Sequence, residues 1–300
     1  MHQVKIKFLP LIALMLIGSV HATGHPTGNM ISVGEYVYWS YINPVDDPSH
    51  YACIMIWKKG SDPAVFLQSK HPASDYMLYN KNDHIYIIER KYSSSTDDYE
   101  VRLLKSTHGK KPEIIWDWFK DEYRIGEGGF IMLSDDQMIF GRYPNVYKMK
   151  RGSSPTTYFK FNQAIVRVRA VEQNNILLSS DSACYLVDQN GTILKQWDGL
   201  IDDEIENAPL NRNQIFDADY SEGELLFAHW GKRSFEVIEA NGNRKKLLQL
   251  HQPLTPHWVA FTGKKKMLFA SRLIMDGSTP KPHLILLEDQ YNQEVVWSIP

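Results

Sequence analysis

The chain repeats one pattern of strands and tight turns six times, at intervals close to 46 residues. The clearest copy, Asn175 to Asp198, reads as strand, loop, strand, tight turn, strand, with no helical periodicity. Aligned on the tight turn, the copies have marker residues spaced 49, 43, 39, 51 and 50 positions apart: Gly60, Gly109, Gly152, Gly191, Gly242 and Asn292. Glycine and asparagine suit these turns because a tight hairpin needs positive φ.

Each copy predicts four strands, one on either side of the tight turn and two upstream of it. In the fourth copy they are Ile165–Val171, Ile176–Leu178, Cys184–Val187 and Ile193–Trp197. Six such units predict an all-β fold, a six-bladed β-propeller with four antiparallel strands per blade. The alternatives are a pair of β-sandwiches, which needs no equal repeats, and a β-helix, whose repeat is usually shorter. We expect at most one helical turn, at Asp202–Asn207.

The repeat also predicts how the ring closes and what the cysteines do. The chain opens on an innermost strand and ends on an outermost one, Val295–Ile299. We therefore expect blade 6 to meet blade 1 by face packing, with little or no strand exchange. Cys53 and Cys184 each lie seven residues before a turn glycine, so they occupy equivalent positions in opposite blades. Their separation should exceed the ~7 Å Cα limit for a disulfide, and we expect two buried free thiols.

Residues 1–22 have the features of a secretory signal peptide. Lys5 and Lys7 precede a short apolar run, and Val20-His21-Ala22 offers small residues for cleavage after Ala22. The alternative, an N-terminal membrane anchor, usually needs about 20 apolar residues. We therefore predict a secreted or periplasmic protein whose residues 23–300 form a single propeller domain, with no transmembrane segment once the signal peptide is removed.

The charge of the chain speaks against a nucleic-acid partner. Without Lys5 and Lys7, 31 basic residues remain against 35 acidic residues. A mildly acidic chain lacks the basic footprint that phosphate backbones require. The Lys264-Lys265-Lys266 run is more typical of a solvated turn than of a phosphate site. We also expect a monomer.

Two sets of residues are candidates for a site at the mouth of the channel, where long loops gather on one face. The first set follows the second strand of several blades and would suit an anionic or carbohydrate-like ligand. Its alternative role is pairing of the arginines with acidic loops on the same face. Its members are Arg90, Arg142, His229, Trp230 and Arg272.

The second set comes from the innermost strands and would line the channel: Asp75, Arg167, Arg169, Asp217, Asp219 and His257. Asp217 and Asp219 face the same side of a strand, so they could perform acid–base chemistry or hold a metal. The alternative is that they pair with Arg167 or Arg169, or bind water in the channel. Asp202-Asp203-Glu204 with Glu206 could bind Ca²⁺, but the spacing lacks the glycine turn and the alternation of a dedicated calcium loop, so a solvated acidic loop is the favoured interpretation; otherwise no cofactor is expected.

No nucleophile elbow, zinc-binding helix, paired Cys-x-x-Cys or phosphate loop occurs in the sequence. The hairpin Tyr185–Trp197 resembles a blade hairpin of NHL-like, quinoprotein-like and arylsulfotransferase-like propellers, and Val237–Asn243 is similar but weaker. The resemblance covers the core of a blade and carries no catalytic motif, so it implies the fold and export more than an activity.

These observations favour an exported binding or interaction protein with a ligand or partner site over the channel mouth. A protein or peptide is the first expectation for the partner and a carbohydrate the second. The alternative is a lyase, hydrolase or sulfotransferase-like enzyme that uses His229 or His257 with neighbouring arginines and Asp217. A third hypothesis, a structural part of an envelope assembly, requires a contiguous apolar patch on an outer blade edge.

Overall fold

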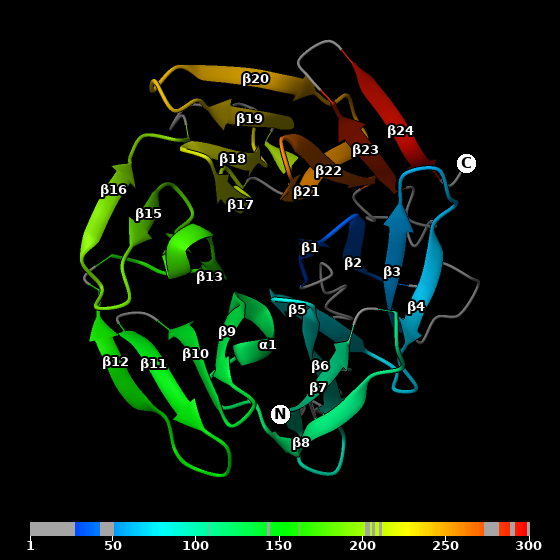
Figure 1. The fold of residues 1–300 in the computed structure, drawn as a ribbon, viewed down its shortest axis with the longest axis vertical. Helices are drawn as coiled ribbons and strands as arrows, with labels where there is room; N and C mark the ends of the chain where they lie inside the picture. Colours follow the sequence, from blue (N-terminus) through cyan, green and yellow to red (C-terminus); the bar gives the residue numbers. More distant parts are fainter. Residues whose placement is uncertain are drawn as a thin grey trace, which may run out of the picture.

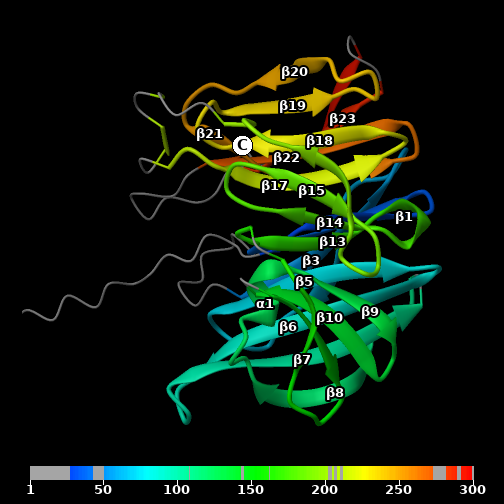
Figure 2. The same cartoon turned by 90° about the vertical axis from the view of Figure 1, so that its left-hand side faces the viewer.

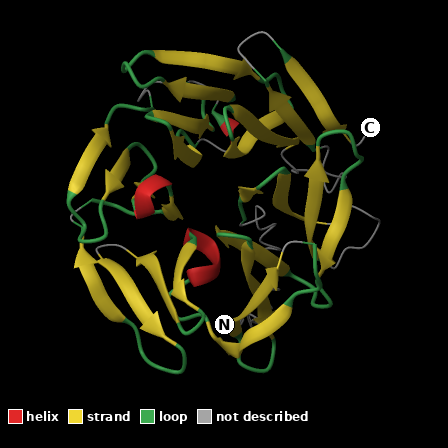
Figure 3. Ribbon diagram, viewed as in Figure 1, coloured by secondary structure: helices red, strands yellow, loops and turns green. Residues whose placement is uncertain are grey.

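Six four-stranded sheets stand around a central channel (Figure 1). The computed structural model describes residues 28–42, 51–107, 109–142, 145–161, 163–201, 205, 208–209, 212–272, 282–288 and 292–298. The strands of each blade run from one face of the ring to the other (Figure 2), and the described residues contain few helical turns (Figure 3). The predicted six-bladed β-propeller with four antiparallel strands per blade is confirmed.

In every blade the strands follow one another in chain order from the channel outward. Blade 1 holds β1 (Met30–Val33), β2 (Tyr36–Ile42), β3 (Ala52–Lys58) and β4 (Ala64–Gln68). Blade 2 holds β5 (Ser74–Lys81), β6 (His84–Ser93), β7 (Asp98–Thr107) and β8 (Glu113–Lys120). Blade 3 holds β9 (Phe130–Ser134), β10 (Gln137–Arg142), β11 (Asn145–Lys150) and β12 (Thr156–Lys160).

Blade 4 holds β13 (Arg167–Ala170), β14 (Ile176–Ser179), β15 (Cys184–Val187) and β16 (Ile193–Trp197). Blade 5 holds β17 (Ile215–Ser221), β18 (Glu224–His229), β19 (Ser234–Ile238) and β20 (Arg244–Gln249). Blade 6 holds β21 (Leu254–Thr262), β22 (Lys265–Arg272), β23 (His283–Leu287) and β24 (Gln293–Ser298). Each predicted strand is present, with boundaries moved by a few residues.

The outer hairpins share a detail that the sequence pattern did not reveal. In all six blades the pairing of the third strand with the fourth contains a register shift. Such bulges bend and twist a strand locally, which makes the outer edge a poor template for pairing with another chain.

The hydrophobic core lies between the blades rather than within any one of them. Five buried clusters join neighbouring blades around the whole ring. Blades 1 and 6 share the cluster that contains Trp39 and Trp258, and the Trp39 ring lies 5.7 Å from that of Trp297 on β24. Because β24 pairs with β23 of its own sheet, the described part of the ring closes by face packing, as expected.

Cys53 and Cys184 are both buried and unbridged, as the repeat predicted. Burial raises the pKa of Cys53 to about 12, so its thiol stays protonated at neutral pH. The two residues therefore act as small apolar side chains in the core.

One helical turn was not predicted. Helix α1 (Ile125–Gly128) lies in the connection between blades 2 and 3, beside the channel (Figure 1). The Asp121 carboxylate accepts the Ile125 N–H at 2.7 Å, which satisfies a backbone donor at the start of the turn. The helical turn expected at Asp202–Asn207 lies almost entirely outside the described residues.

Glycines let α1 and its flanking residues lie close to neighbouring strands. A Cβ on Gly126 would lie 2.8 Å from the Cδ of Arg90, and one on Gly129 would lie 2.4 Å from the Val168 carbonyl oxygen. Gly129 has φ 83° and ψ 162°, a conformation that residues other than glycine rarely adopt. The glycine-rich segment after blade 2 is therefore a packing requirement of the channel mouth.

We predict that Gly129→Ala destabilises the fold by about 2–5 kcal/mol, because backbone strain and a clash with Val168 add together. Gly152→Ala is the matched control: it also has positive φ, but no atom lies within 4 Å of the added Cβ. It should cost only about 1–2 kcal/mol. Urea unfolding of the two variants measures the difference, and equal losses would contradict the close packing of Gly129.

Candidate functional site

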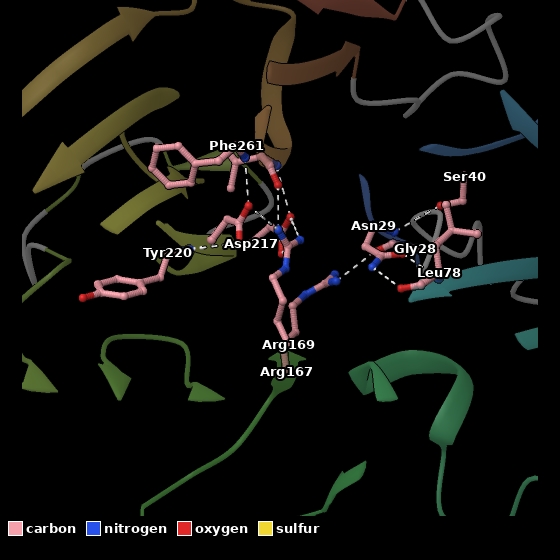
Figure 4. Close-up of polar contacts among 11 residues, drawn as sticks. Gly28, Asn29, Ser40, Leu78, Arg167, Arg169, Asp217, Tyr220 and Phe261 are labelled. Atoms are coloured by element: carbon pink, nitrogen blue, oxygen red, sulfur yellow. Dashed lines mark hydrogen bonds and ion pairs between the residues drawn. The ribbon is translucent and has the colours of Figure 1, made fainter. Parts of the chain in front are cut away.

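Two arginines and two aspartates from the inner strands form a cluster in the channel (Figure 4). Arg169 on β13 donates from Nη2 to both carboxylate oxygens of Asp217, at 2.9 and 3.2 Å. Its Nη1 lies 3.3 Å from Asp219 Oδ2. Asp217 and Asp219 are two apart on β17, so both face Arg169. Of the two roles left open by the sequence, pairing with an arginine is the one seen here.

The same side chains bind the free edges of inner strands. The Asp217 carboxylate accepts the Val259 N–H at 3.1 Å, and the Asp219 carboxylate accepts the Phe261 N–H at 2.8 Å. Arg169 Nη1 donates to the Val259 carbonyl at 2.9 Å. An innermost strand has a partner on one side only, so these side chains satisfy backbone groups that would otherwise face the channel unpaired.

Asn29 binds the free edge of the innermost strand of blade 2, β5, in the same way. Its Nδ2 donates to the Leu78 carbonyl at 2.7 Å, and its Oδ1 accepts the Leu78 N–H at 2.8 Å. Arg167 reaches across the channel from blade 4, and its Nη1 donates to the Gly28 carbonyl before blade 1 at 2.8 Å. Figure 4 shows the two arginines leaving β13 together and diverging towards these separate partners.

The electrostatics of the cluster keep Arg169 charged. Burial lowers its pKa, but the two aspartates outweigh that effect and the net shift is upward. Burial raises the pKa of Asp219, against the opposing influence of Arg169 and of the Phe261 N–H. Each carboxylate is held by several donors, so neither is placed like a free general base.

Little space remains inside the channel cluster. The cavity beside Arg167 and Arg169 has a volume of about 10 Å³, room for roughly one water molecule. An organic ligand therefore does not fit among these side chains as they stand.

His257 and Trp230, two other predicted site residues, are buried in an aromatic cluster. His257 is 2% exposed, and its Nδ1 lies 3.0 Å from the Thr255 carbonyl oxygen, to which an Nδ1–H donates. Its ring lies 5.0 Å from Phe216 and 5.3 Å from Trp230. The Trp230 indole donates to the Pro209 carbonyl at 2.9 Å. Both residues serve the packing of blade 5 against blade 6.

His229 is completely buried in a polar network on blade 5. Its Nε2 lies 3.0 Å from Asn213 Oδ1, and its Nδ1 lies 3.3 Å from Glu236 Oε1. Glu236 also accepts from Ser234 at 2.7 Å and from Arg244 at 2.6 Å. Burial opposes ionisation of Glu236, but these hydrogen bonds hold its pKa at about 2.

The network fixes the connection that joins blades 4 and 5. Arg244 donates from Nη2 to the Leu200 carbonyl at 2.8 Å, and Asn213 belongs to the same connection. The His229–Glu236 pair thus resembles a catalytic dyad in its spacing, but with 0% exposure His229 has no access to a substrate.

A much larger pocket opens at the end of blade 2. It has a volume of about 550 Å³, within the range of about 300–1,000 Å³ typical of ligand sites. Its lining residues come from the β6–β7 hairpin, the end of β8, the connection that follows and α1: Arg90, Tyr92, Asp97, Asp98, Tyr99, Lys120, Asp121, Glu122, Arg124 and Glu127. We call it the blade-2 pocket.

Arg90 forms the floor of the blade-2 pocket. It is 6% exposed and pairs with Glu127 at 2.7 Å, Asp121 at 3.5 Å and Asp75 at 3.8 Å. Its guanidinium stacks 3.5 Å from the centre of the Tyr99 ring. Arg90 therefore pairs with acidic groups of its own face, the alternative considered from the sequence, and at the same time positions an aromatic ring.

Two tyrosines form an exposed rim above Arg90. Tyr92 is 43% exposed and Tyr99 is 38% exposed, and their rings lie 5.6 Å apart. They are directly paired across β6 and β7 near the ends of these strands, which are ten residues long. The extension of the hairpin beyond the rest of the blade is what presents the two rings.

The structure therefore does not bring the first predicted set together. Arg90 lies in the blade-2 pocket, Arg142 is exposed at the end of β10, and the side chain of Arg272 lies outside the described residues. His229 and Trp230 are buried in blade 5. Tyr92 and Tyr99 were not among the predicted site residues, because the strand pattern predicts Ile85–Ile88 and Tyr99–Leu104 as the middle strands of blade 2 and does not reveal that β6 and β7 extend to a shared end at these tyrosines.

No group of three or more His, Cys, Asp or Glu side chains in the described ranges is arranged to hold a metal ion. The acidic residues considered for Ca²⁺, Asp202, Asp203, Glu204 and Glu206, lie outside those ranges. Within the part of the chain that the structure covers, no helix has the length and apolar character to cross a membrane.

Several solved protein structures are similar to this chain, all at low sequence identity. No family model and no curated protein sequence matches the chain. Virginiamycin B lyase from Staphylococcus aureus is 12% identical, with 82% of this chain and 92% of that chain covered and a TM-score of 0.47. A chain of the nidogen/laminin complex is 14% identical, with 90% and 91% covered and a TM-score of 0.48.

A third similar structure, puromycin hydrolase, is 9% identical, with 93% of this chain and 55% of that chain covered and a TM-score of 0.48. The six four-stranded sheets themselves decide the assignment. The chain is a six-bladed β-propeller. At these identities the activities of the similar proteins do not transfer to this propeller, whose site is argued from its own residues.

We predict that Glu236→Gln removes a stabilising contribution that depends on pH. The pKa of Glu236 lies at about 2 in the folded protein against an ordinary value of 4.5, so folding favours the ionised carboxylate. The contribution, about 3 kcal/mol, is fully present above pH 4.5 and is lost as the pH falls from 4.5 to 2. Urea unfolding of wild type and variant at several pH values measures it.

Glu288→Gln provides the control for that experiment. Hydrogen bonds from Lys265 and Lys59 also lower the pKa of Glu288 to about 2, but this group is at the surface. Its effect should be small and should disappear in high salt, whereas that of Glu236 should persist. A pH-independent loss in Glu236→Gln would contradict the account of the buried network.

Proposed function

We propose that the chain is an exported β-propeller binding protein whose partner site is the channel-mouth face, centred on the blade-2 pocket. The observation that carries the proposal is the contrast between the two spaces on this face. The cavity in the channel cluster has a volume of about 10 Å³, whereas the blade-2 pocket has about 550 Å³ and is lined by aromatic and charged side chains. Binding residues concentrate on loops that a rigid scaffold positions.

The residue types of the blade-2 pocket suit a protein or peptide partner. Tyrosine and arginine are enriched among the residues that dominate binding energy at protein interfaces. Tyr92 and Tyr99 present large rings, and Arg90 holds one of them from below, so the rim loses little conformational entropy on binding. Five acidic and three basic residues line the pocket, which favours a partner segment with a basic excess.

A carbohydrate is the second candidate partner. Exposed tyrosine rings beside carboxylates can bind a ligand with an apolar face and many hydroxyl groups, and both are present in the blade-2 pocket. A carbohydrate ligand needs no positive charge, so the charge of the ligand distinguishes the two candidate partners.

The burial of His229 and His257 favours a binding protein over an enzyme. The enzyme alternative needed His229 or His257 in a concave site within reach of a partner. They are 0% and 2% exposed, and neither lines the channel cavity or the blade-2 pocket.

The alternative of a structural part in a larger assembly needed one apolar patch on an outer edge. The exposed apolar residues Val65, Ile114, Leu194 and Val295 instead belong to four different blades, which also supports a monomer.

Replacing the rim tyrosines should weaken binding without unfolding the propeller. The mature chain is screened against arrays of peptides and of oligosaccharides, and each hit is titrated against variants. Tyr92→Ser and Tyr99→Ser should each reduce affinity at least tenfold, about 1.4 kcal/mol, as expected for an aromatic contact at the centre of an interface. Leu194→Ser, a change at a more exposed apolar residue on β16 of blade 4, should leave affinity unchanged. Equal affinity in all three variants would contradict the proposed site.

Export is tested separately. Expression of the full chain should yield a protein outside the cytoplasm that begins at Thr23, because the residues before it have the features of a cleaved signal peptide. N-terminal sequencing of the purified protein reads the start directly. Ala22→Arg, which removes a small residue from the cleavage site, should yield the uncleaved chain, and a wild-type protein that starts at Met1 would overturn the prediction.

A further inference from the structure

Arg167 has a different set of partners from the other arginines at the channel. Arg90 and Arg169 each form ion pairs with at least two carboxylates. For Arg167, no carboxylate of the described residues lies within ion-pair distance, and its hydrogen bond goes to the Gly28 carbonyl. A guanidinium carries five N–H donors and keeps its charge at all ordinary pH values, so most of its donors are available to a ligand.

The remaining space beside Arg167 is small, and Arg167, Arg169 and Ser179, whose side chains carry N–H or O–H donors, line it together with Asp217 and apolar residues. Ser179 pairs directly with Arg167 across β13 and β14, so both side chains lie on one face of the sheet and line the cavity. Arg169 lines it from the next position on that face. The volume of about 10 Å³ admits one water-sized particle.

The acidic groups of the cavity do not neutralise Arg167. Asp217 also lines the cavity, but its oxygens already accept from Arg169 and from the Val259 N–H. The Asp219 carboxylate likewise pairs with Arg169 and accepts the Phe261 N–H. Burial lowers the pKa of Arg167, with Asp217 opposing and Arg169 adding to the shift, as expected for a positive charge that is incompletely compensated.

We propose that the channel cavity beside Arg167 binds one small inorganic anion, of the charge and size class of chloride, between the Arg167 guanidinium and the Ser179 hydroxyl. Such an anion would lie between blades 4 and 1, the two blades that Arg167 joins through Gly28. This anion site is separate from the blade-2 pocket, and the proposal does not depend on the partner proposed for that pocket.

The dependence of thermal unfolding on chloride tests the proposal. Sodium chloride is exchanged for sodium gluconate at constant ionic strength, since gluconate is too large for the cavity. Because an anion that binds only the native state stabilises it, Tm should rise by about 2–4 °C for each tenfold increase in chloride above the dissociation constant. Arg167→Gln should abolish this dependence, whereas Arg142→Gln, an exposed arginine on β10, should retain it.

Crystals of the wild-type protein grown or soaked in sodium bromide give a second reading that does not depend on the folding of a variant. An anomalous peak is expected within hydrogen-bond distance of Arg167 and Ser179. A cavity that contains only water under these conditions would overturn the proposal, as would a chloride response of equal size in Arg167→Gln and wild type.

Discussion

The free inner edges of the six sheets are the constraint on which this structure depends. Each innermost strand has a hydrogen-bonding partner on its outer side only, so its other edge presents N–H and C=O groups to the channel. Asn29, Asp217 and Asp219 bind such groups directly on the neighbouring blade, and Arg169 binds one two blades away. Polar residues of the channel that looked catalytic in the sequence thus have a structural purpose: with Asn29, they bind backbone groups on the inner edges of β5 and β21, where a further strand is lacking.

This use of the channel decides where ligands can bind. The cavity among the cross-linking side chains of the channel has room for about one water-sized particle, so a larger partner does not fit among them, and the blade-2 pocket is the more spacious of the two sites. Among the described residues, blade 2 contributes a pocket to the rim, because β6 and β7 extend to ten residues and α1 lies against Arg90. The glycines of α1 make that close approach possible, which connects the packing of the channel mouth with the floor of the blade-2 pocket.

The fold could be predicted from the sequence because a repeat needs no long-range information. The turn glycines, the strand count and the equivalence of Cys53 and Cys184 all follow from local patterns that recur six times. Helix α1 could not be predicted, because four residues rich in glycine carry no helical pattern and are held by Asp121 and by packing.

The site was less predictable because partners of a polar side chain are set by distant residues. Arg169 and Asp217 lie 48 positions apart, and Asp217 and Val259 lie 42 apart. The sequence showed that arginines and acids would share one face, but it could not show which acid each arginine meets. It also could not show that His229 and His257 turn into the core, because His229 ends β18 and His257 lies at a register shift within β21, where the alternation of the strand does not fix the face.

Native-state hydrogen exchange of the backbone amides at the channel tests the central claim most directly. Leu78, Val259 and Phe261 donate to side chains of the channel rather than to a neighbouring strand. If these bonds hold the inner edges, the three amides should exchange as slowly as those paired inside the sheets, through opening of the whole domain. Exchange as rapid as that of exposed turns such as Gly60 would show that the inner edges are open and that the channel side chains do not close them.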